Sequence, residues 1–283
     1  MINDSIVTVA VVQPPVPDAA APEEYLCDGK RYVAEAAGSG ADFICLPEYF
    51  GVFGVDLSEW RDYMSSGDSH IEELRGLAER YGVALIYPTL EFSGEDLFNT
   101  TYLINSDGGL VGKYRKTHLT LDERTRCGLT SGDELPVFEL EGVPVAVMTC
   151  YDGYFPEVAR ILSLKGAKII FWPSLQRGST EDSILLQARS RAMDNSVFIV
   201  RSSYGHPNDV GWKTGMMPGT SCVVDREGRV LVNAGVDEGF VSTSLDWLNE
   251  RPRPRSFEGG NEYPSVIICE DRRPELYGAL AVN

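Results

Sequence analysis

The regular alternation of strand-like and helix-like segments along nearly the whole chain is the feature that most restricts how it can fold. Short runs of apolar and β-branched residues are typical of buried strands, and apolar residues spaced three or four positions apart indicate helices. We predict strands at 5–12, 42–46, 83–87, 98–104, 110–114, 137–140, 143–148, 168–172, 197–201 and 221–224, with further strands to about residue 245. Helices are predicted at 22–37, 68–80, 156–164 and 182–195. This interleaving favours an α/β fold, and hairpin signals at 105–109 and 141–142 favour a mixed sheet.

No repeat, low-complexity linker or change of composition marks a domain boundary within the 283 residues. We therefore expect a single domain over residues 1–283. Residues 119–136, which are rich in charge and glycine, are predicted to form a loop. The closing residues, about 251–283, are rich in proline and arginine. We expect this tail to pack on the domain or on a partner subunit.

Composition restricts the partners that the protein can have. The formal net charge is −17, with 42 acidic against 25 basic residues, and a surface of this sign repels nucleic-acid phosphates and anionic lipid. No segment reaches the ~20 consecutive apolar residues of a membrane helix, and no basic region followed by an apolar one opens the chain. We expect a cytoplasmic protein with neither a nucleic-acid nor a membrane partner.

The cysteine pattern argues for reduced thiols. The six cysteines are scattered, with no Cys-x-x-Cys pair; they are Cys27, Cys45, Cys127, Cys150, Cys222 and Cys269. A chain of this length needs no disulfides to supplement its core, and half of these cysteines lie in strand-like apolar contexts. No pair of cysteines or histidines has the spacing of a zinc site, so no metal is expected.

Three polar residues each follow a predicted strand directly: Glu48, Lys116 and Cys150. Cys150 lies at a strand-to-helix corner in the run VPVAVMTCYDGYFPEVAR, where Pro156 suits the first position of a helix. Strand ends often supply active-site residues, because the strand fixes their position and the loop beyond leaves room for a ligand. Taken singly, these residues would be a packed core cysteine, a solvated loop carboxylate and part of a charged surface cluster.

As a set, the three residues suit hydrolysis. A thiol needs a base, and a carboxylate shielded from water can have a pKa high enough to serve. A nearby lysine can stabilise a negatively charged tetrahedral intermediate. The sequence around them resembles the nitrilase superfamily of carbon–nitrogen hydrolases, whose members carry Glu, Lys and Cys in this order. The resemblance rests on LPEYF around Glu48, GKYRKTHL around Lys116 and TCYDGYFPEVAR around Cys150, and it extends over nearly the whole chain.

The resemblance implies a role for each residue. Glu48 would be the general base, Cys150 the nucleophile and Lys116 the cation that stabilises the oxyanion, with the backbone N–H of Tyr151 as a second donor. Glu123 resembles an accessory glutamate that orients the lysine or the substrate, although Asp122 or Glu134 could occupy that place. The segment formed by Trp172, Pro173 and Ser174 resembles the wall of the pocket behind the nucleophile.

The resemblance also implies an α-β-β-α sandwich, in which two mixed sheets pack face to face with helices outside. A homodimer or higher homo-oligomer is implied too, joined through helices near the nucleophile and through a C-terminal segment. The implied reaction needs no metal or organic cofactor, because the cysteine forms a thioester with the acyl group and water then hydrolyses it.

Three interpretations from other classes compete. His118 lies two residues beyond Lys116 and could suggest a Cys-His protease, but neither other histidine has a supporting motif. A metal-dependent phosphoesterase would need a cluster of Asp and His at strand ends, which the sequence does not offer. A binding module that has lost activity is disfavoured because Glu48, Lys116 and Cys150 are all present.

The residues after the nucleophile favour an amide as the substrate. The order YDxxFPE resembles hydrolases of small amides, whereas nitrilases carry Trp-Glu after the cysteine. We therefore rank amidase first, N-carbamoyl amidohydrolase second and nitrilase third. Asp152 could meet a cationic group of the substrate or cap the turn, and capping is favoured.

Overall fold

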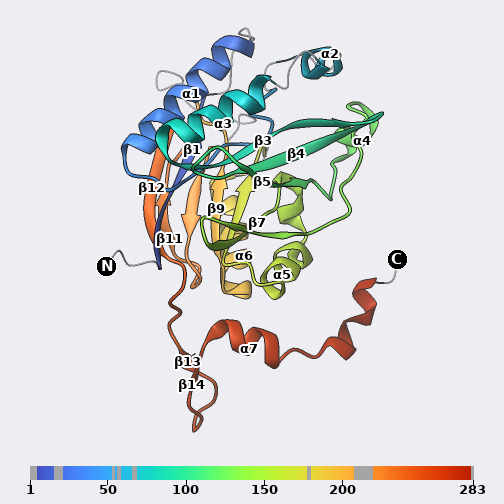
Figure 1. The fold of residues 1–283 in the computed structure, drawn as a ribbon. Coiled ribbons are helices and arrows are strands. Elements are labelled where there is room, and N and C mark those ends of the chain that lie inside the picture. Colours follow the sequence, from blue (N-terminus) through green and yellow to red (C-terminus); the bar gives the residue numbers. More distant parts are fainter. Residues whose placement is uncertain are drawn as a thin grey trace.

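The computed structural model describes residues 5–15, 22–52, 55, 59–65, 69–176, 180–206 and 219–281. Two six-stranded sheets form its centre (Figure 1). The first has the order β12-β1-β2-β3-β4-β5, and the second has the order β11-β10-β9-β8-β7-β6. Each sheet contains three adjacent parallel strands, β1, β2 and β3 in the first and β7, β8 and β9 in the second, so both sheets are mixed as predicted.

The strands of the first sheet are β1 (Ile6–Gln13), β2 (Phe43–Cys45), β3 (Ala84–Ser93), β4 (Asp96–Ile104), β5 (Leu110–Arg115) and β12 (Gly239–Asp246). Those of the second are β6 (Val137–Leu140), β7 (Val143–Val147), β8 (Ile169–Pro173), β9 (Phe198–Ser202), β10 (Cys222–Val224) and β11 (Val230–Asn233). The longer helices are α1 (Pro22–Gly38), α3 (Ser69–Tyr81), α5 (Pro156–Leu164) and α6 (Glu181–Asn195). The first predicted position of the second helix, Asp68, lies outside the described residues.

Helices cover the outer face of each sheet, and this gives the four layers of an α-β-β-α sandwich (Figure 1). Val33 of α1 and Leu74 of α3 are fully buried against the first sheet. Between the sheets, the rings of Phe43 and Phe171 lie 6.1 Å apart in one continuous core. The predicted stripe of α6, which includes Ala188, is buried against the second sheet. The predicted fold class is confirmed.

Strand β3 is longer than predicted because Pro88 does not end it. The predicted strand ends at Tyr87, and the next residue is a proline, which cannot donate to a ladder. The parallel pairing of β3 with β2 ends at Ile86, and beyond that point β3 pairs only with β4. Pro88 therefore lies where one side of the strand needs no donor.

Three short α-helices are absent from the sequence-based prediction: α2 (Trp60–Ser65), α4 (Leu121–Thr125) and α7 (Pro264–Glu270). Helix α4 lies inside the segment predicted to be a loop. Its five residues are stabilised by a capping box, in which the Thr120 side chain accepts from the Glu123 N–H and the Glu123 carboxylate accepts from the Thr120 N–H. This arrangement also fixes the Glu123 side chain.

The chain ends in an arm, residues 251–281, that leaves the sandwich and runs below α5 and α6 (Figure 1). The arm contains the paired strands β13 (Arg253–Pro254) and β14 (Asn261–Glu262), helix α7 (Pro264–Glu270) and the 3₁₀ helix η2 (Pro274–Ala281). Neither α7 nor η2 contains a buried residue. Within the part of the chain that the structure describes, no helix is long and apolar enough to cross a membrane.

Candidate active site

Four of the residues singled out in the sequence meet in one buried cluster near the strand ends of the two sheets. Glu48 follows β2, Lys116 follows β5, Cys150 follows β7 and Glu123 lies in α4. The Nζ atom of Lys116 is 2.8 Å from Glu48 Oε1 and 2.8 and 2.9 Å from the two carboxylate oxygens of Glu123. The side chains of Lys116 and Glu48 are each 1% exposed. A single ammonium group is thus shared by two shielded carboxylates.

Cys150 lies at a strained corner of the backbone. Its φ angle is 44°, in the left-handed region that residues with a Cβ rarely adopt, and strain of this kind is often found at functional sites. The 3₁₀ helix η1 (Cys150–Tyr154) begins there. The indole Nε1 of Trp172 donates to the Cys150 carbonyl oxygen over 3.1 Å and so holds the corner from behind.

Burial dominates the electrostatics of the cluster. Burial raises the pKa of Glu48 above its usual value, although Lys116 opposes this rise. Burial, and then the charge of Glu48, raises the pKa of the Cys150 thiol. Burial would lower the pKa of Lys116, but the charges of Glu48, Cys150 and Glu123 together hold it above its usual value. The site therefore contains a thiol and a carboxyl group of raised pKa, with the Lys116 ammonium group in contact with that carboxyl.

Burial also acts on Glu123, but the net shift of its pKa is opposite to that of Glu48. Burial raises the pKa of this carboxyl, whereas Lys116, Tyr49 and the Thr120 N–H lower it, and the net shift is downward. Glu48 and Glu123 therefore differ in basicity, and Glu48 is the better proton acceptor. Neither Asp122 nor Glu134 contacts Lys116 among the described hydrogen bonds, so the structure places Glu123 next to the lysine.

Three further side chains support the cluster and were not found from the sequence. Asn99 donates from Nδ2 to Glu48 Oε1 over 2.8 Å and to Glu123 Oε1 over 3.2 Å. The Tyr49 hydroxyl donates to Glu123, and the Tyr204 hydroxyl donates to the Glu48 carbonyl over 2.8 Å. Tyr49 was within reach of the sequence argument, because it directly follows Glu48 in LPEYF. Asn99 and Tyr204 carried no signal, since they lie in the interior of β4 and just beyond β9.

Asp152 caps the corner, and both of its carboxylate oxygens accept hydrogen bonds from within the protein. It is fully buried, and its Oδ2 accepts from the Thr149 N–H over 2.8 Å and from the Tyr114 hydroxyl over 2.7 Å. Its Oδ1 accepts from the Thr117 hydroxyl over 3.0 Å and from the His118 backbone N–H over 2.9 Å, and His118 Nδ1 lies at the same distance of 2.9 Å. Asp152 thus joins the loop that carries Lys116 to the corner that carries Cys150, and His118 is part of this joint.

The remaining predicted residues surround the corner. Tyr151 is half-buried, with its ring 5.3 Å from the rings of Tyr154 and Phe155. Trp172 and Pro173 are buried at the end of β8. Ser174 is fully buried, and its backbone N–H donates to the Ser202 carbonyl over 2.8 Å. The segment predicted to form the wall of the pocket therefore contacts Cys150 through the hydrogen bond of the Trp172 indole.

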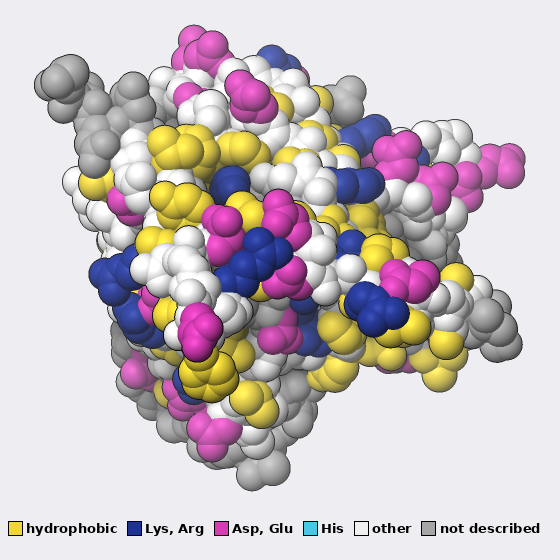
Figure 2. Space-filling model, turned by 90° about the horizontal axis from the view of Figure 1, so that it is seen from below, with side chains coloured by type: hydrophobic (Ala, Val, Ile, Leu, Met, Phe, Trp, Pro, Cys, Tyr) yellow, Lys and Arg dark blue, Asp and Glu magenta, His cyan; other side chains and the backbone are white. Residues whose placement is uncertain are grey.

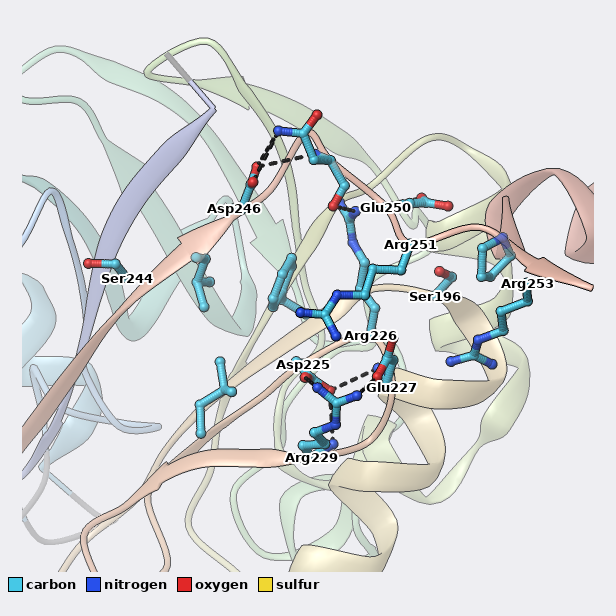
Figure 3. Close-up of a pocket in the computed structure, with 15 residues that line it drawn as sticks. Ser196, Asp225, Arg226, Glu227, Arg229, Ser244, Asp246, Glu250, Arg251 and Arg253 are labelled. Atoms are coloured by element: carbon cyan, nitrogen blue, oxygen red, sulfur yellow. Dashed lines mark hydrogen bonds and ion pairs between the residues drawn. The ribbon is translucent and has the colours of Figure 1, made fainter. Parts of the chain in front are cut away.

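A cavity of about 310 Å³ lies apart from the cluster, and none of these residues lines it (Figure 3). It lies beside the first residue of β9 and the last residues of β12, whereas Cys150 lies near the carboxyl ends of the parallel strands. Its lining pairs acidic side chains with arginines, among them Arg229 with Asp225 and Glu227 (Figure 3). Within the described part of the chain, no group of three or more His, Cys, Asp or Glu side chains could hold a metal ion.

A nucleophilic thiol, a basic carboxylate and a fixed cation in one shielded cluster can form and break an acyl bond. The fold and the site together thus define a hydrolase of the cysteine-dependent class. The family comparison makes this class specific. The model of the carbon-nitrogen hydrolase family matches residues 8–247, and the chain belongs to this family.

Individual relatives agree with the family match. The 2-oxoglutaramate amidase of Bacillus subtilis is 30% identical over 255 residues, covering 87% of this chain and 91% of the relative. The omega-amidase NIT2 of Xenopus tropicalis is 32% identical over 231 residues, covering 76% of this chain and 80% of the relative. A double mutant of the amidase from Nesterenkonia sp. AN1, solved in complex with acrylamide, superposes with a TM-score of 0.80 at 24% identity, covering 99% of each chain. This last likeness shows the shared fold.

Proposed function

We propose that this enzyme hydrolyses the carbon–nitrogen bond of a small amide through a thioester on Cys150. The observation that carries the proposal is the position of the Lys116 ammonium group, which lies between the carboxylates of Glu48 and Glu123 in contact distance of both. Its charge also acts on the Cys150 thiol. The reaction needs a base, a nucleophile and a cation, and these three groups can supply them without a cofactor.

In the proposed first step, Glu48 accepts the proton of the Cys150 thiol while the sulfur attacks the carbonyl carbon of the amide. The electron pair of the carbonyl bond moves to oxygen, and the resulting oxyanion is stabilised by Lys116 Nζ and the backbone N–H of Tyr151. The intermediate then expels the amine, which takes the proton held by Glu48. This leaves the acyl group on sulfur as a thioester.

In the proposed second step, Glu48 takes a proton from water, and the oxygen of that water attacks the thioester carbon. The carbon–sulfur bond breaks, the carboxylic acid leaves, and the proton returns to the Cys150 sulfur. Glu48 thus acts as base and acid in turn, for which a raised pKa is favourable. Glu123 holds Lys116 in place and stays ionised, in line with its lowered pKa.

The names of the relatives support an amide as the substrate. Both sequence relatives described above are amidases by name, one of them acting on 2-oxoglutaramate. N-carbamoyl compounds and nitriles are the second and third candidates, because the same three groups could attack either. The residue after the nucleophile favours amides, since Tyr151 stands where nitrilases carry a tryptophan.

A hydrolysis screen over matched amides, N-carbamoyl amines and nitriles tests this proposal. Ammonia release is measured for each compound with the wild-type chain and with Cys150→Ala as the blank. We expect turnover of amides that exceeds turnover of the other two classes and that is abolished in Cys150→Ala. Equal activity of the two proteins would refute the role of Cys150, and a preference for nitriles would overturn the substrate class.

We also propose that the chain works in the cytoplasm as a homodimer or higher oligomer. The chain would be a single domain, and its arm would pack on a partner subunit. The arm leaves large side chains exposed, including Leu276 at 62% and Leu280 at 69%. In α6, the helix that lies above the arm in Figure 1, Leu186 and Met193 are 65% and 49% exposed. Figure 2 shows this face, where hydrophobic side chains lie among charged ones. A second copy of the chain would cover these hydrophobic side chains. The five described cysteines are all free, which suits a reducing compartment such as the cytoplasm.

A further inference from the structure

Arg201, in β9, is a fully buried cation that the reaction above does not use. Its Nη1 donates to the carbonyl oxygens of Gly219 and Thr220 over 3.0 and 2.9 Å, and its Nη2 donates to Gln176 Oε1 over 3.2 Å. Among the described residues, its Nε finds no acceptor, no carboxylate forms an ion pair with it, and every hydrogen-bond partner it has is neutral. A buried cation in such surroundings is costly unless negative charge elsewhere offsets it.

The wall behind the nucleophile connects Arg201 to Cys150. Arg201 pairs with Trp172 in the register of β8 and β9, and its guanidinium carbon lies 5.5 Å from the centre of the Trp172 ring. The same indole donates to the Cys150 carbonyl oxygen. Gln176, which accepts from Arg201, directly follows Leu175. The backbone N–H of Leu175 is directed at the Cys150 thiol. Arg201 therefore holds both ends of the segment that backs the nucleophile.

The charges of the cluster leave a place for a second cation. With Glu48, Glu123 and Lys116 ionised, two negative charges face one positive charge, which leaves one negative charge in excess. Burial lowers the pKa of Arg201, while Cys222, Cys150, Glu48 and Tyr154 raise it. Cys150 and Glu48 belong to the cluster, and Arg201 adjoins it through Trp172 and Gln176, with no hydrogen bond to either group among the described residues.

We propose that Arg201 is a positioning residue and the second buried counter-cation of the active site. Through Trp172 and Gln176 it fixes the wall behind Cys150, and its charge offsets the excess negative charge of Glu48 and Glu123. It therefore favours the thiolate and the oxyanion that form during the reaction. The proposal rests on Cys150 as the nucleophile, but it makes a claim about the thiol that holds whatever the substrate is.

Alkylation of Cys150 by iodoacetamide, followed by mass spectrometry across a pH series, tests the proposal without any substrate. In Arg201→Met we expect the midpoint of the alkylation profile to move to higher pH and the rate near neutral pH to fall about 10-fold, because a buried positive charge is lost. In Arg201→Lys, which keeps the charge and loses the planar fork, most of the shift should be reversed. On amides, kcat should fall about 10-fold in Arg201→Met, with KM changed less.

Arg226, at the 310 Å³ cavity, offers a control (Figure 3). It is also a buried arginine that donates to two backbone carbonyls, and its Nε likewise finds no acceptor among the described residues. It also lies over an aromatic ring, that of Phe198 at 4.9 Å. Unlike Arg201, it also pairs with a carboxylate, Glu250, over 3.7 Å. Arg226→Met removes a buried arginine away from Cys150 and should leave the alkylation midpoint unchanged. If Arg201→Met does not fold, Arg201→Gln, which can still donate to the carbonyls, takes its place with the same expectation.

Two results would overturn the proposal. An unshifted midpoint in the folded neutral variant would show that the charge has no effect on the thiol. An equal fall in the alkylation rate of Cys150 in Arg201→Lys and Arg201→Met would show that only the hydrogen bonds of Arg201 matter, not its charge. If the midpoint shifts as expected but no amide is hydrolysed, the inference about Arg201 holds and the proposed function fails.

Discussion

At the scale of single residues, Lys116 is the group on which the proposed chemistry depends most. Its side chain is 1% exposed, and an ammonium group at such depth is strongly unfavourable unless it is paired. Glu48 and Glu123 provide the pairing from two different segments of the chain. The position of the cation is therefore fixed before a substrate arrives, as stabilisation of an oxyanion requires.

Replacement of this lysine should affect turnover more than binding. In Lys116→Ala we expect kcat to fall by ~10²-fold or more, the scale of a lost oxyanion donor, with a smaller change in KM. Lys113→Ala is the matched control, because Lys113 lies on β5, which Lys116 directly follows, and forms its ion pair with Glu91 outside the cluster. Its kcat should stay close to that of the wild type. A change confined to KM in Lys116→Ala would make Lys116 a substrate-binding residue.

The pH dependence of kcat/KM should report Glu48. The base must be ionised to accept the thiol proton, so activity is present above its pKa and is lost as the pH falls through it. Because burial raises the pKa of Glu48, the acid limb should lie above the value of about 4.3 of an ordinary glutamate. Circular dichroism at each pH checks that the chain stays folded. An acid limb at or below that ordinary value in folded protein would exclude Glu48 as the base.

At this scale the sequence predicted the residues at strand ends and missed those inside strands. Glu48, Lys116 and Cys150 each follow an apolar run, which marks them in a one-dimensional pattern. Asn99 contacts two carboxylates that are 51 and 24 positions away, so its role exists only after the chain has folded. Arg201 lies within β9, one residue before its end, and no motif of the sequence singled it out.

At the scale of elements, the corner after β7 depends on close contact between η1 and β8. A Cβ atom built on Gly153 would lie 2.1 Å from Trp172 Cζ2, so no larger residue fits beside the indole without a shift. The same indole holds the Cys150 carbonyl. Packing and nucleophile geometry are thus linked through one ring.

Gly153→Ala tests this link. We expect the free energy of unfolding to fall by about 1–3 kcal/mol, the usual cost of overpacking, and kcat to fall with it because the indole moves. Urea unfolding and steady-state kinetics measure the two effects. Gly76→Ala in α3, where nothing lies within 4 Å of the new Cβ, should be neutral or slightly stabilising. An unaltered kcat in a destabilised Gly153→Ala would separate the packing from the chemistry.

The elements were predicted well where local patterns act alone. The hairpin of β4 and β5 and the apolar stripe of α6 follow from turn chemistry and periodicity. The sequence could not show that β3 continues past Pro88, because this depends on which neighbouring strand is present at that point. Helix α4 has five residues, too few for a periodic signal, and its capping box stood within a charged stretch.

At the scale of the whole molecule, the four-layer sandwich could be inferred from the family resemblance, whereas the residue patterns indicated only a mixed α/β fold. The reason is that strand order and the division into two sheets depend on long-range pairing, such as that of β1 with β12. The arm leaves the sandwich, and neither of its helices contains a buried residue. A cavity of about 510 Å³ remains between it and the body, beside Arg160, Ile267 and Leu280.

Removal of the arm should weaken assembly. A chain that ends at Arg251 is expected to sediment as a smaller species than the full chain at equal concentration, because the exposed side chains of α7 and η2 would no longer contact a second copy. Analytical ultracentrifugation measures the two masses. Leu110→Ser, which removes an exposed leucine of the sandwich away from the arm, should leave the mass unchanged. Identical oligomers with and without the arm would refute its role in assembly.

The central claim is that Cys150 carries the acyl group during turnover of an amide. Rapid acid quenching during hydrolysis of an amide substrate, followed by mass spectrometry of the intact chain and its peptides, tests this claim directly. The account predicts an added mass equal to the acyl group on the peptide containing Cys150, formed and lost at rates compatible with kcat. Turnover at full rate with no adduct on Cys150, or the same turnover in Cys150→Ala, would contradict it.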